Sequence, residues 1–429
     1  MENNEITALA AEAERALAPI FAEIDENSYR RTADVLAAFE NNKVSDGCFA
    51  GTSGYGYDDK GREVLDRVYA EVFGTEAALV RINFVNGTHA LSTGLFALLR
   101  PGDTLFSVAG KPYDTLEEVI GISGTPGNGS LADFGVKYAQ HELTADGRLD
   151  TDGVLARLAA DPTVKVVFIQ RSKGYLNRRT LTPDEIGEFY DAVKSAHPDV
   201  LVVVDNCYGE FTSPAEPRAD MLIGSLIKNP GGGMAETGGY IAGSARAVEL
   251  ASYRLTTVGT GAEVGCTMGQ NKNLFRGFFY APHTVAAALK TMHLAAYIFE
   301  KLGYETSPTW DERRSDIIQT VVTHSPEALC AFCRGIQSGS PVDAYVEPVP
   351  WAMPGYSDEV IMAAGAFVQG SSIELSCDGP LREPYTVYLQ GGLTYESGKY
   401  GILKAAAAVG RCAKIKTRQI NIHKERSQK

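Results

Sequence analysis

Apolar residues recur along the chain at two spacings, one typical of helices and one typical of strands. Residues 5–40 and about 61–73 carry the helical spacing. Residues 77–84 alternate weakly and fit either a helix or a strand. Further on, short apolar runs predict strands at 104–108, 136–138, 165–169, 200–205 and 221–225, with an antiparallel or edge strand at 238–242.

Helical segments separate these strands. We expect helices at 88–99, 115–120, 151–160 and 183–196. The last has Thr182 at the N-cap and Pro183 at the first helical position, and both residue types are favoured there. Strands that alternate with helices predict an α/β fold with a mostly parallel sheet. Ligand-binding side chains then belong at the carboxyl ends of the strands and at helix N-termini.

The pattern changes beyond residue 282. A long helical run at 282–302 would bridge to a smaller α+β domain, where we expect strands at 320–323, 372–375 and 386–390 and helices at 326–337 and 400–413. We therefore predict three parts, which are an N-terminal helical arm (1–75), a large domain (76–285) and a small C-terminal domain (286–429).

Composition and charge narrow the functional classes. The 429 residues are 44% hydrophobic and 22% charged, which is ordinary for a globular protein. A net charge of -13 argues against nucleic acid as a partner. The apolar runs have the length of strands and the first residues lack a signal-peptide pattern, so we expect neither a membrane span nor export. Seven scattered cysteines suit reduced thiols in a cytoplasmic protein.

The most informative residue is Lys228, which lies in a glycine-rich stretch after an apolar strand that ends in Asp205. An enzyme that uses pyridoxal 5′-phosphate (PLP) needs a lysine to hold the cofactor as a Schiff base and an acid to keep the pyridine nitrogen protonated. Ser225, three residues before the lysine, could bond a phosphate oxygen. Alone, each residue reads more simply as a capping Asp or a solvated lysine. Together they predict a PLP site.

Two further segments could complete such a site. Gly87-Thr88-His89 opens a predicted helix, where free N–H groups face an anion, although Gly-Thr before a helix is also ordinary capping. Tyr113 follows the strand at 104–108, where its ring could stack on a planar cofactor or its phenol could act as an acid or base. The alternative is a tyrosine in a Pro-Tyr-Asp turn.

An amino-acid substrate also needs a cation for its carboxylate, and arginine binds carboxylates with two hydrogen bonds. Arg382 is the first candidate, with Arg171 and Arg276 as rivals. The alternative for Arg382 is a surface residue paired with Glu383.

Other features predict no further chemistry. Cys330 and Cys333 form a lone CxxC inside a helical pattern and have no second pair at zinc spacing, so we expect a core helix. The seven histidines show no metal spacing, and no metal is expected. The glycines at 231–233 lack the Lys-Ser/Thr ending of a P-loop. Cys207 reads as a buried strand-end residue rather than a catalytic thiol.

Taken together, these motifs resemble those of the fold-type I PLP enzymes, in the cystathionine and methionine γ-lyase group. The chain is most similar to the branch known as the methionine γ-lyase family or aluminium resistance proteins. The resemblance covers nearly the whole chain and rests on Gly54-Tyr55-Gly56-Tyr57-Asp58-Asp59, Gly87-Thr88-His89-Ala90, Gln170-Arg171-Ser172, Asp205-Asn206-Cys207-Tyr208-Gly209-Glu210, Ser225-Leu226-Ile227-Lys228-Asn229-Pro230-Gly231-Gly232-Gly233 and Gln390-Gly391-Gly392-Leu393-Thr394.

The resemblance implies an aspartate aminotransferase-like large domain that binds PLP and a smaller C-terminal domain. It also implies a site at a dimer interface, usually within a tetramer, with Tyr55 or Tyr57 of the N-terminal segment reaching the neighbouring subunit. The implied roles are a Schiff base at Lys228, a pyridine-nitrogen contact at Asp205, ring stacking by Tyr113, and phosphate or cofactor contacts by Gly87, Thr88, His89 and Ser225.

The implied activity is lysis of a carbon–sulfur bond in an amino acid such as cystathionine, methionine or cysteine. Elimination would give a 2-oxo acid, ammonia and a thiol, with Tyr113 as the acid for the leaving sulfur. The chain departs from the better-known γ-lyases at Ile227, where they carry Thr, and at 229–231, where they run Tyr-x-x-Gly-His. β- and γ-elimination therefore stay open, and the alternatives are an aminotransferase, an aldolase or a non-catalytic protein of this fold.

Overall fold

The computed structural model describes residues 3–174, 176, 178–353 and 358–427. It divides into two compact units. The larger unit holds residues 27–283, and the smaller holds the first 26 residues together with residues 284–429. The predicted boundary near 285 falls close to this division, whereas the predicted arm is split, since residues 27–75 belong to the larger unit.

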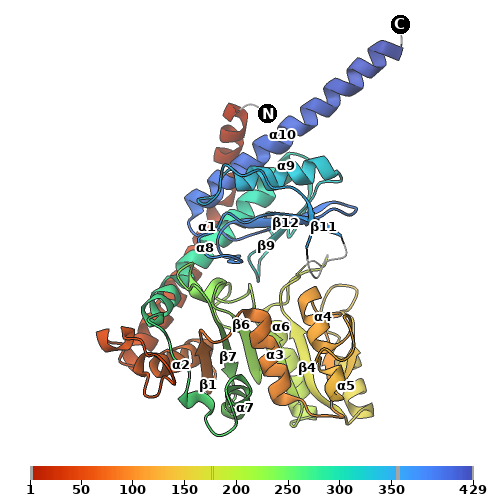
Figure 1. Ribbon diagram of the computed structural model, residues 1–429. Coiled ribbons are helices and arrows are strands. Elements are labelled where there is room, and N and C mark those ends of the chain that lie inside the picture. Colours follow the sequence, from red (N-terminus) through yellow and green to blue (C-terminus); the bar gives the residue numbers. More distant parts are fainter. Residues whose placement is uncertain (1–2, 175, 177, 354–357, 428–429) are drawn as a thin grey trace. The chain divides into compact units, whose positions relative to one another are not determined.

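A seven-stranded sheet forms the centre of the larger unit (Figure 1). Its spatial order is β1-β7-β6-β5-β4-β2-β3. Strands β2 to β6 run parallel to one another, while β7 is antiparallel to both β6 and β1. The strands are β1 (Ala77–Arg81), β2 (Thr104–Ser107), β3 (Lys137–Gln140), β4 (Val164–Gln170), β5 (Leu201–Asp205), β6 (Met221–Ser225) and β7 (Gly239–Gly243). The predicted mostly parallel α/β sheet is confirmed, and the ambiguous segment at 77–84 contains a strand.

Helices cover both faces of this sheet, because successive strand residues point to opposite sides. On β7, Ile241 belongs to the core that includes Leu91 of α3 and Val248 of α7. Its neighbour Tyr240 instead contacts Tyr69 of α2, with ring centroids 5.8 Å apart. The helices of this unit include α2 (Lys60–Phe73), α3 (Gly87–Leu98), α4 (Asp114–Ile120), α5 (Thr151–Ala160), α6 (Pro183–Ala196) and α7 (Ala245–Leu255).

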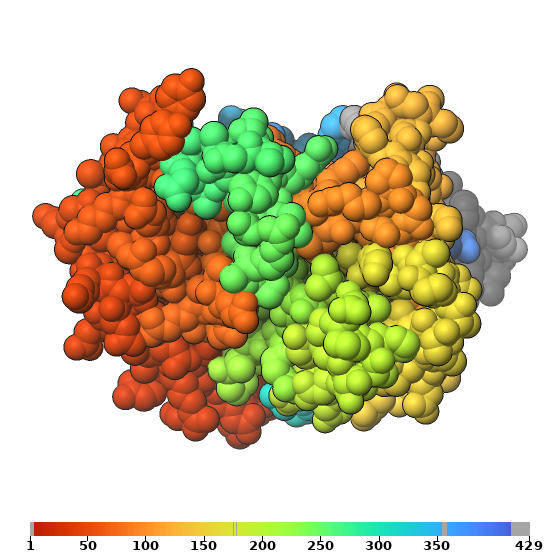
Figure 2. All heavy atoms as spheres, turned by 90° about the horizontal axis from the view of Figure 1, so that it is seen from below, coloured from red at the N-terminus to blue at the C-terminus, as the bar shows by residue number. Residues whose placement is uncertain are grey.

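Distant segments of the chain adjoin on the surface of the larger unit. The backbone N–H groups of Gly265 and Met268 donate to the carbonyl oxygens of Tyr55 and Thr52. Figure 2 shows the corresponding red-orange and green segments side by side. The Gly/Tyr-rich loop, residues 51–59, is therefore anchored to the chain just before α8 (Asn271–Lys301).

The smaller unit has a six-stranded antiparallel sheet in the order β10-β11-β12-β13-β9-β8. Helices α9 (Pro326–Gln337) and α10 (Tyr395–Ser427) contribute to its core. The strands are β8 (Glu305–Ser307), β9 (Ile318–Val322), β10 (Trp351–Ala352), β11 (Glu359–Ala363), β12 (Ser376–Pro380) and β13 (Thr386–Gln390). This agrees with the predicted α+β class.

The strand predicted at 372–375 is wrong, because those residues form turns and β12 begins only at Ser376. The cause is local hydrogen bonding. The Glu374 carboxylate accepts the backbone N–H groups of Phe367 and Val368, at 2.8 and 3.0 Å, and this holds the segment in a turn.

Two long helices, α1 (Asn3–Asn41) and α8 (Asn271–Lys301), carry the chain between the units. The predicted start of the second at Pro282 is wrong, since Pro282 lies inside α8. A proline within a helix costs about 3 kcal/mol or more, because it removes an N–H and clashes with the preceding turn. Buried residues on both sides of it, such as Phe278 and Val285, keep the helix continuous.

Candidate active site

The carboxyl ends of β4, β5 and β6 bring the predicted site residues together. The strand register pairs Gln170 with Asp205, and Asp205 with Ile223 on β6. Lys228 lies three residues beyond the end of β6, where the chain enters a short 3-10 helix (Asn229–Gly231). Its Nζ stands 4.0 Å from the ring centroid of Tyr208. The parallel sheet thus places an acid and a lysine from different strands at one edge.

Asp205 and Lys228 are coupled through their charges. Burial raises the pKa of Asp205, which is 5% exposed, and the nearby Lys228 lowers it in part. Burial would lower the pKa of Lys228, but Cys207, Tyr208, Asp205 and Tyr113 together raise it above its ordinary value. The backbone N–H of Cys207 also donates to Asp205 Oδ1 at 3.1 Å, which fixes the carboxylate.

Ser225 supplies a polar atom with no partner. Its side chain is 1% exposed, and its Oγ has no hydrogen-bond partner among the described residues. Buried polar atoms are nearly always paired, so an unpaired one calls for an explanation. A bound anion that accepts a hydrogen bond from this hydroxyl would explain the missing partner.

The start of α3 lies against Ser225 because residue 87 is a glycine. A Cβ on Gly87 would come within 3.2 Å of Ser225 Cβ and 3.6 Å of Cys207 Sγ. The first turn of a helix leaves N–H groups without helical partners, and these favour an anion. In α3 the N-cap side chain of Asn86 accepts the N–H of His89, which leaves the N–H groups of Gly87 and Thr88 at the helix entrance. The donor set fits a phosphate.

Tyr113 joins this helix start to the end of β4. Its hydroxyl lies 2.8 Å from Thr88 Oγ1, and its backbone N–H donates to Gln170 Oε1 at 2.8 Å. Burial, with the charge of Asp205, raises the pKa of Tyr113 well above its usual value. The phenol therefore keeps its proton at neutral pH. His89 has a structural contact, since its Nδ1 accepts the N–H of Val85 at 3.1 Å.

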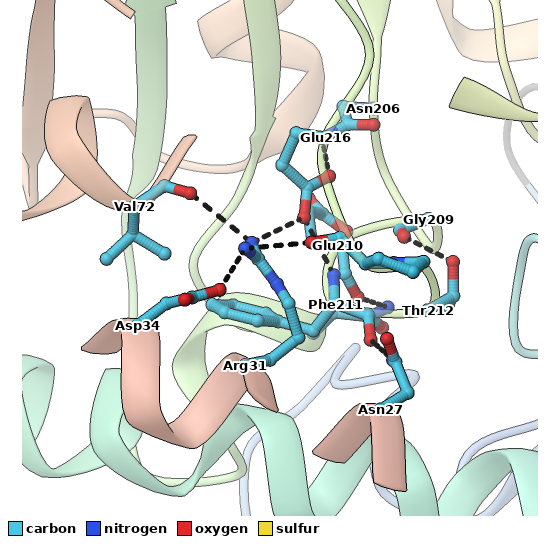
Figure 3. A network of polar contacts seen from close by, with 12 residues as sticks. Asn27, Arg31, Asp34, Val72, Asn206, Gly209, Glu210, Phe211, Thr212 and Glu216 are labelled. Carbon is cyan, nitrogen blue, oxygen red and sulfur yellow. Dashed lines mark hydrogen bonds and ion pairs between the residues drawn. The ribbon is translucent and has the colours of Figure 1, made fainter. Parts of the chain in front are cut away.

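The loop after β5 is held in an uncommon conformation. Tyr208 and Phe211 have φ values of 72° and 63°, in the left-handed region that side chains rarely adopt. Each such residue costs on the order of 1–3 kcal/mol and persists only where its surroundings hold it. Glu216 Oε1 accepts the N–H of Phe211 at 3.0 Å, and Asn27 Nδ2 donates to its carbonyl at 3.1 Å (Figure 3).

Arg171 is not available to a substrate, contrary to its prediction as a carboxylate ligand. It is fully buried, and its Nη1 donates to Asn206 Oδ1 at 2.7 Å and to Glu216 Oε2 at 3.4 Å. Arg31 approaches Glu216 from α1, with Nη2 3.3 Å from Oε1 (Figure 3). We call these buried residues, Arg31, Arg171, Asn206 and Glu216, the arginine network. No sequence motif indicates this network, because its members are far apart in the chain.

The remaining arginine candidates, Arg382 and Arg276, belong to different units of the protein. Arg382 belongs to the smaller unit, is half-exposed and pairs with Asp358 at 3.1 Å rather than with Glu383. Arg276 is exposed on α8 in the larger unit. The role of Arg382 stays a prediction.

Tyr55 and Tyr57 project from the anchored Gly/Tyr-rich loop. They are 76% and 55% exposed, and their rings stack with centroids 5.6 Å apart. The loop is fixed below them by Asp59, whose carboxylate accepts bonds from Thr267 Oγ1 at 2.6 Å and Asn271 Nδ2 at 3.0 Å.

The described residues offer neither a metal site nor a membrane-spanning helix. Among the side chains that the structure describes, no group of three or more His, Cys, Asp and Glu is placed to hold a metal ion. None of the helices described in the structure is long and apolar enough to cross a membrane. The CxxC cysteines lie in α9, as expected for a core helix, with Cys333 buried.

The fold defines the class. The mixed sheet of the larger unit, with the smaller antiparallel unit, matches the fold-type I PLP-dependent structures. One example is the PLP-dependent protein YhfS of Escherichia coli, with a TM-score of 0.58 and 16% identity over 90% of this chain and 97% of that one. At this identity the likeness concerns the fold alone.

Nearer relatives give the family. The model of the family described as methionine gamma-lyase matches residues 6–410, and the chain belongs to that family. The uncharacterized protein YnbB of Bacillus subtilis is 50% identical over 399 residues, which are 92% of this chain and 94% of YnbB. A carbon-sulfur lyase involved in aluminium resistance from Clostridium novyi NT is 48% identical, with a TM-score of 0.90 over 94% of this chain and 95% of that one. The resemblance seen in the sequence is confirmed.

Proposed function

We propose that the protein is a PLP-dependent lyase that cleaves a carbon–sulfur bond in an amino acid. The observation that carries the proposal is the charged pair of Lys228 and Asp205 beside the unpaired hydroxyl of Ser225. The carbon-sulfur lyase of Clostridium novyi supports the reaction class. The products would be a 2-oxo acid, ammonia and a thiol.

The residues present fit the cofactor. Lys228 would hold PLP covalently and Asp205 would pair with its pyridine nitrogen. The phosphate would occupy the cradle formed by the Ser225 hydroxyl and the entrance of α3 at Gly87 and Thr88. When bound, PLP supplies an electron sink for the substrate's α-carbon.

The chain's own groups would then orient the substrate and move protons. The Lys228 amine would take the proton from the substrate α-carbon as a general base. Tyr113 would stack on the cofactor ring, and its retained phenolic proton makes it the candidate acid for the departing sulfur. The hydrogen bond that the Tyr113 backbone N–H donates to Gln170 Oε1 fixes the backbone from which the phenol extends.

Further residues are proposed to bind the substrate carboxylate and to contact a second subunit. Arg382 is our candidate for the substrate carboxylate, because its half-exposed guanidinium can exchange Asp358 for an incoming acid. The exposed, stacked rings of Tyr55 and Tyr57 would reach a second copy of the chain in a homodimer or homotetramer. Seven cysteines, all free of disulfides, support a cytoplasmic setting.

A substrate panel tests the reaction. Purified protein loaded with PLP is given cystathionine, cysteine or methionine, and thiol, 2-oxo acid and ammonia are measured together. We expect the three products in equal amounts from at least one substrate. Amino transfer to 2-oxoglutarate without thiol release would instead indicate an aminotransferase. Aldehyde release from a β-hydroxy amino acid would indicate an aldolase, and no turnover of any amino acid would indicate a binding protein.

A further inference from the structure

Glu210 is a buried acid that the proposed chemistry does not use. It lies in the loop after β5, between the two left-handed residues, and is 0% exposed. Its Oε1 is 2.8 Å from the hydroxyl of Tyr240. Its Oε2 has no hydrogen-bond partner among the described residues.

The surroundings of Glu210 favour a neutral carboxyl group. The titratable and charged groups that face it are Tyr240 on β7, Tyr69 on α2, and Cys207, Glu216 and Arg171. Glu216 already lies between Arg171 and Arg31, so two cations face a carboxylate that is better placed than Glu210. A buried carboxylate oxygen without a donor is far more costly when the group is ionised than when it is neutral.

The pKa of Glu210 agrees with this geometry. Burial is the largest cause and the negative charge of Glu216 adds to it, while a hydrogen bond from Glu210's own backbone N–H, the Tyr240 hydroxyl and Arg171 act in the opposite direction. The net effect raises the pKa of Glu210 to about 8.

Hydrogen bonds link Glu210 to the segment that contains Lys228 and to the segment that contains Asp205. Its carbonyl oxygen accepts a bond from Asn229 Nδ2 at 3.0 Å, and Asn229 is the residue after Lys228. On the other side, Asn206 Nδ2 donates to the Tyr240 hydroxyl at 3.3 Å, and Asn206 is the residue after Asp205. The segment that bears the lysine and the segment that bears the aspartate thus meet at Glu210.

We propose that Glu210 is a positioning residue that, as a neutral acid, holds the Lys228 and Asp205 segments in place and loosens them when it ionises. The link to cofactor binding rests on the proposed function, whereas the protonation of Glu210 does not. Measurements on the protein without cofactor therefore test whether Glu210 is protonated. Measurements on the protein loaded with PLP test whether this protonation affects cofactor binding.

The sign of the pH dependence follows from linkage. A glutamate in the unfolded chain ionises near 4.5, its ordinary value, and Glu210 in the folded protein ionises at about 8. Between these values the folded protein keeps a proton that the unfolded chain has released, so stability falls as pH rises. Glu210 alone would raise the unfolding equilibrium constant about tenfold per pH unit in this window.

The decisive variant is Glu210→Gln, which imitates the neutral acid and cannot ionise. Urea unfolding of cofactor-free protein is measured at pH 6 and pH 8 for wild type and variant. We divide the folding equilibrium constant of the variant by that of wild type at each pH. We expect this ratio to be at least tenfold larger at pH 8 than at pH 6. An equal ratio at both pH values would overturn the proposal. Glu188→Gln is the control, because this exposed carboxylate on α6 lies outside the buried cluster and its ratio to wild type should be equal at both pH values.

The link to the site has its own measurement. The dissociation constant of PLP is followed from pH 7 to pH 9 by absorbance for both proteins. We expect the wild-type constant to rise several-fold more than that of Glu210→Gln. If the stability ratio changes with pH but the two affinity profiles coincide, the positioning role is overturned. If wild type binds no PLP at any pH, the proposed function fails, and the stability result still decides the protonation of Glu210.

Discussion

The Lys228 site and the arginine network are two buried polar clusters in one unit of the protein, and they differ in the pairing of one group each, the Ser225 hydroxyl and the Glu216 carboxylate. At the site, Ser225 Oγ has no partner among the described residues and a glycine keeps the approach open. In the arginine network, both oxygens of Glu216 accept hydrogen bonds, from Arg31, Phe211, Arg171 and Asn206.

This difference indicates that the Ser225 hydroxyl can bind a ligand, whereas the Glu216 carboxylate stabilises the fold. An unpaired buried donor is costly alone and becomes favourable when a ligand satisfies it. A carboxylate with both oxygens paired, as in Glu216, adds rigidity and has no oxygen left for a ligand. The loop from Asp205 to Phe211 joins the two clusters, so one end of it belongs to the candidate site and the other end contacts Glu216. Removing a group should therefore affect function at the first cluster and stability at the second.

The largest effect is expected for Lys228→Ala. Loss of the residue that holds the cofactor and moves the proton should lower activity at least about 10³-fold, since general bases alone contribute about 10²–10⁴-fold. Activity and the near-visible absorption of lysine-linked PLP are the measurements. Lys194→Ala is the control, because that lysine pairs with Asp220 away from the site. Equal activity in wild type and Lys228→Ala would remove Lys228 from the mechanism.

Arg171→Ala should come next and should act on stability. Removing one partner from a buried ion pair typically costs about 3–5 kcal/mol in the free energy of unfolding. Urea unfolding without cofactor measures it. Arg218→Ala is the matched control, since its exposed pair with Asp191 should contribute at most about 1 kcal/mol. Similar small losses in both variants would mean that the arginine network does not support the loop.

The smallest effect, and the sharpest test of the comparison, is Ser225→Ala. Hydrogen bonds to charged groups contribute about 1.5–3 kcal/mol, so PLP should dissociate about 10- to 100-fold more readily. The cofactor-free variant should be as stable as wild type or slightly more stable, because the buried Ser225 hydroxyl has no hydrogen-bond partner to lose.

A paired hydroxyl supplies the contrast. Thr182 caps α6 by accepting the N–H of Glu185. Thr182→Ala should cost about 1 kcal/mol of stability and leave the PLP affinity unchanged. If Ser225→Ala behaved like Thr182→Ala, the unpaired hydroxyl would not be a ligand-binding group.

The sequence was enough to predict the parallel sheet and the grouping of Lys228, Asp205 and Ser225, because strand ends meet at one edge of such a sheet. It was not enough for Arg171. A strand-end arginine looks the same whether it faces a substrate or a buried glutamate, and Glu216 lies 45 positions further along the chain. Local rules also misplaced two elements. Proline favours a helix start, yet α8 passes through Pro282, and Glu374 folds a strand-like segment into turns.

The central claim is that Lys228 holds the cofactor, and one measurement tests it most directly. Protein loaded with PLP is reduced with borohydride, digested, and mapped by mass spectrometry. The account predicts a phosphopyridoxyl group on the peptide that contains Lys228. The same group on another lysine, or on no peptide at all, would contradict it.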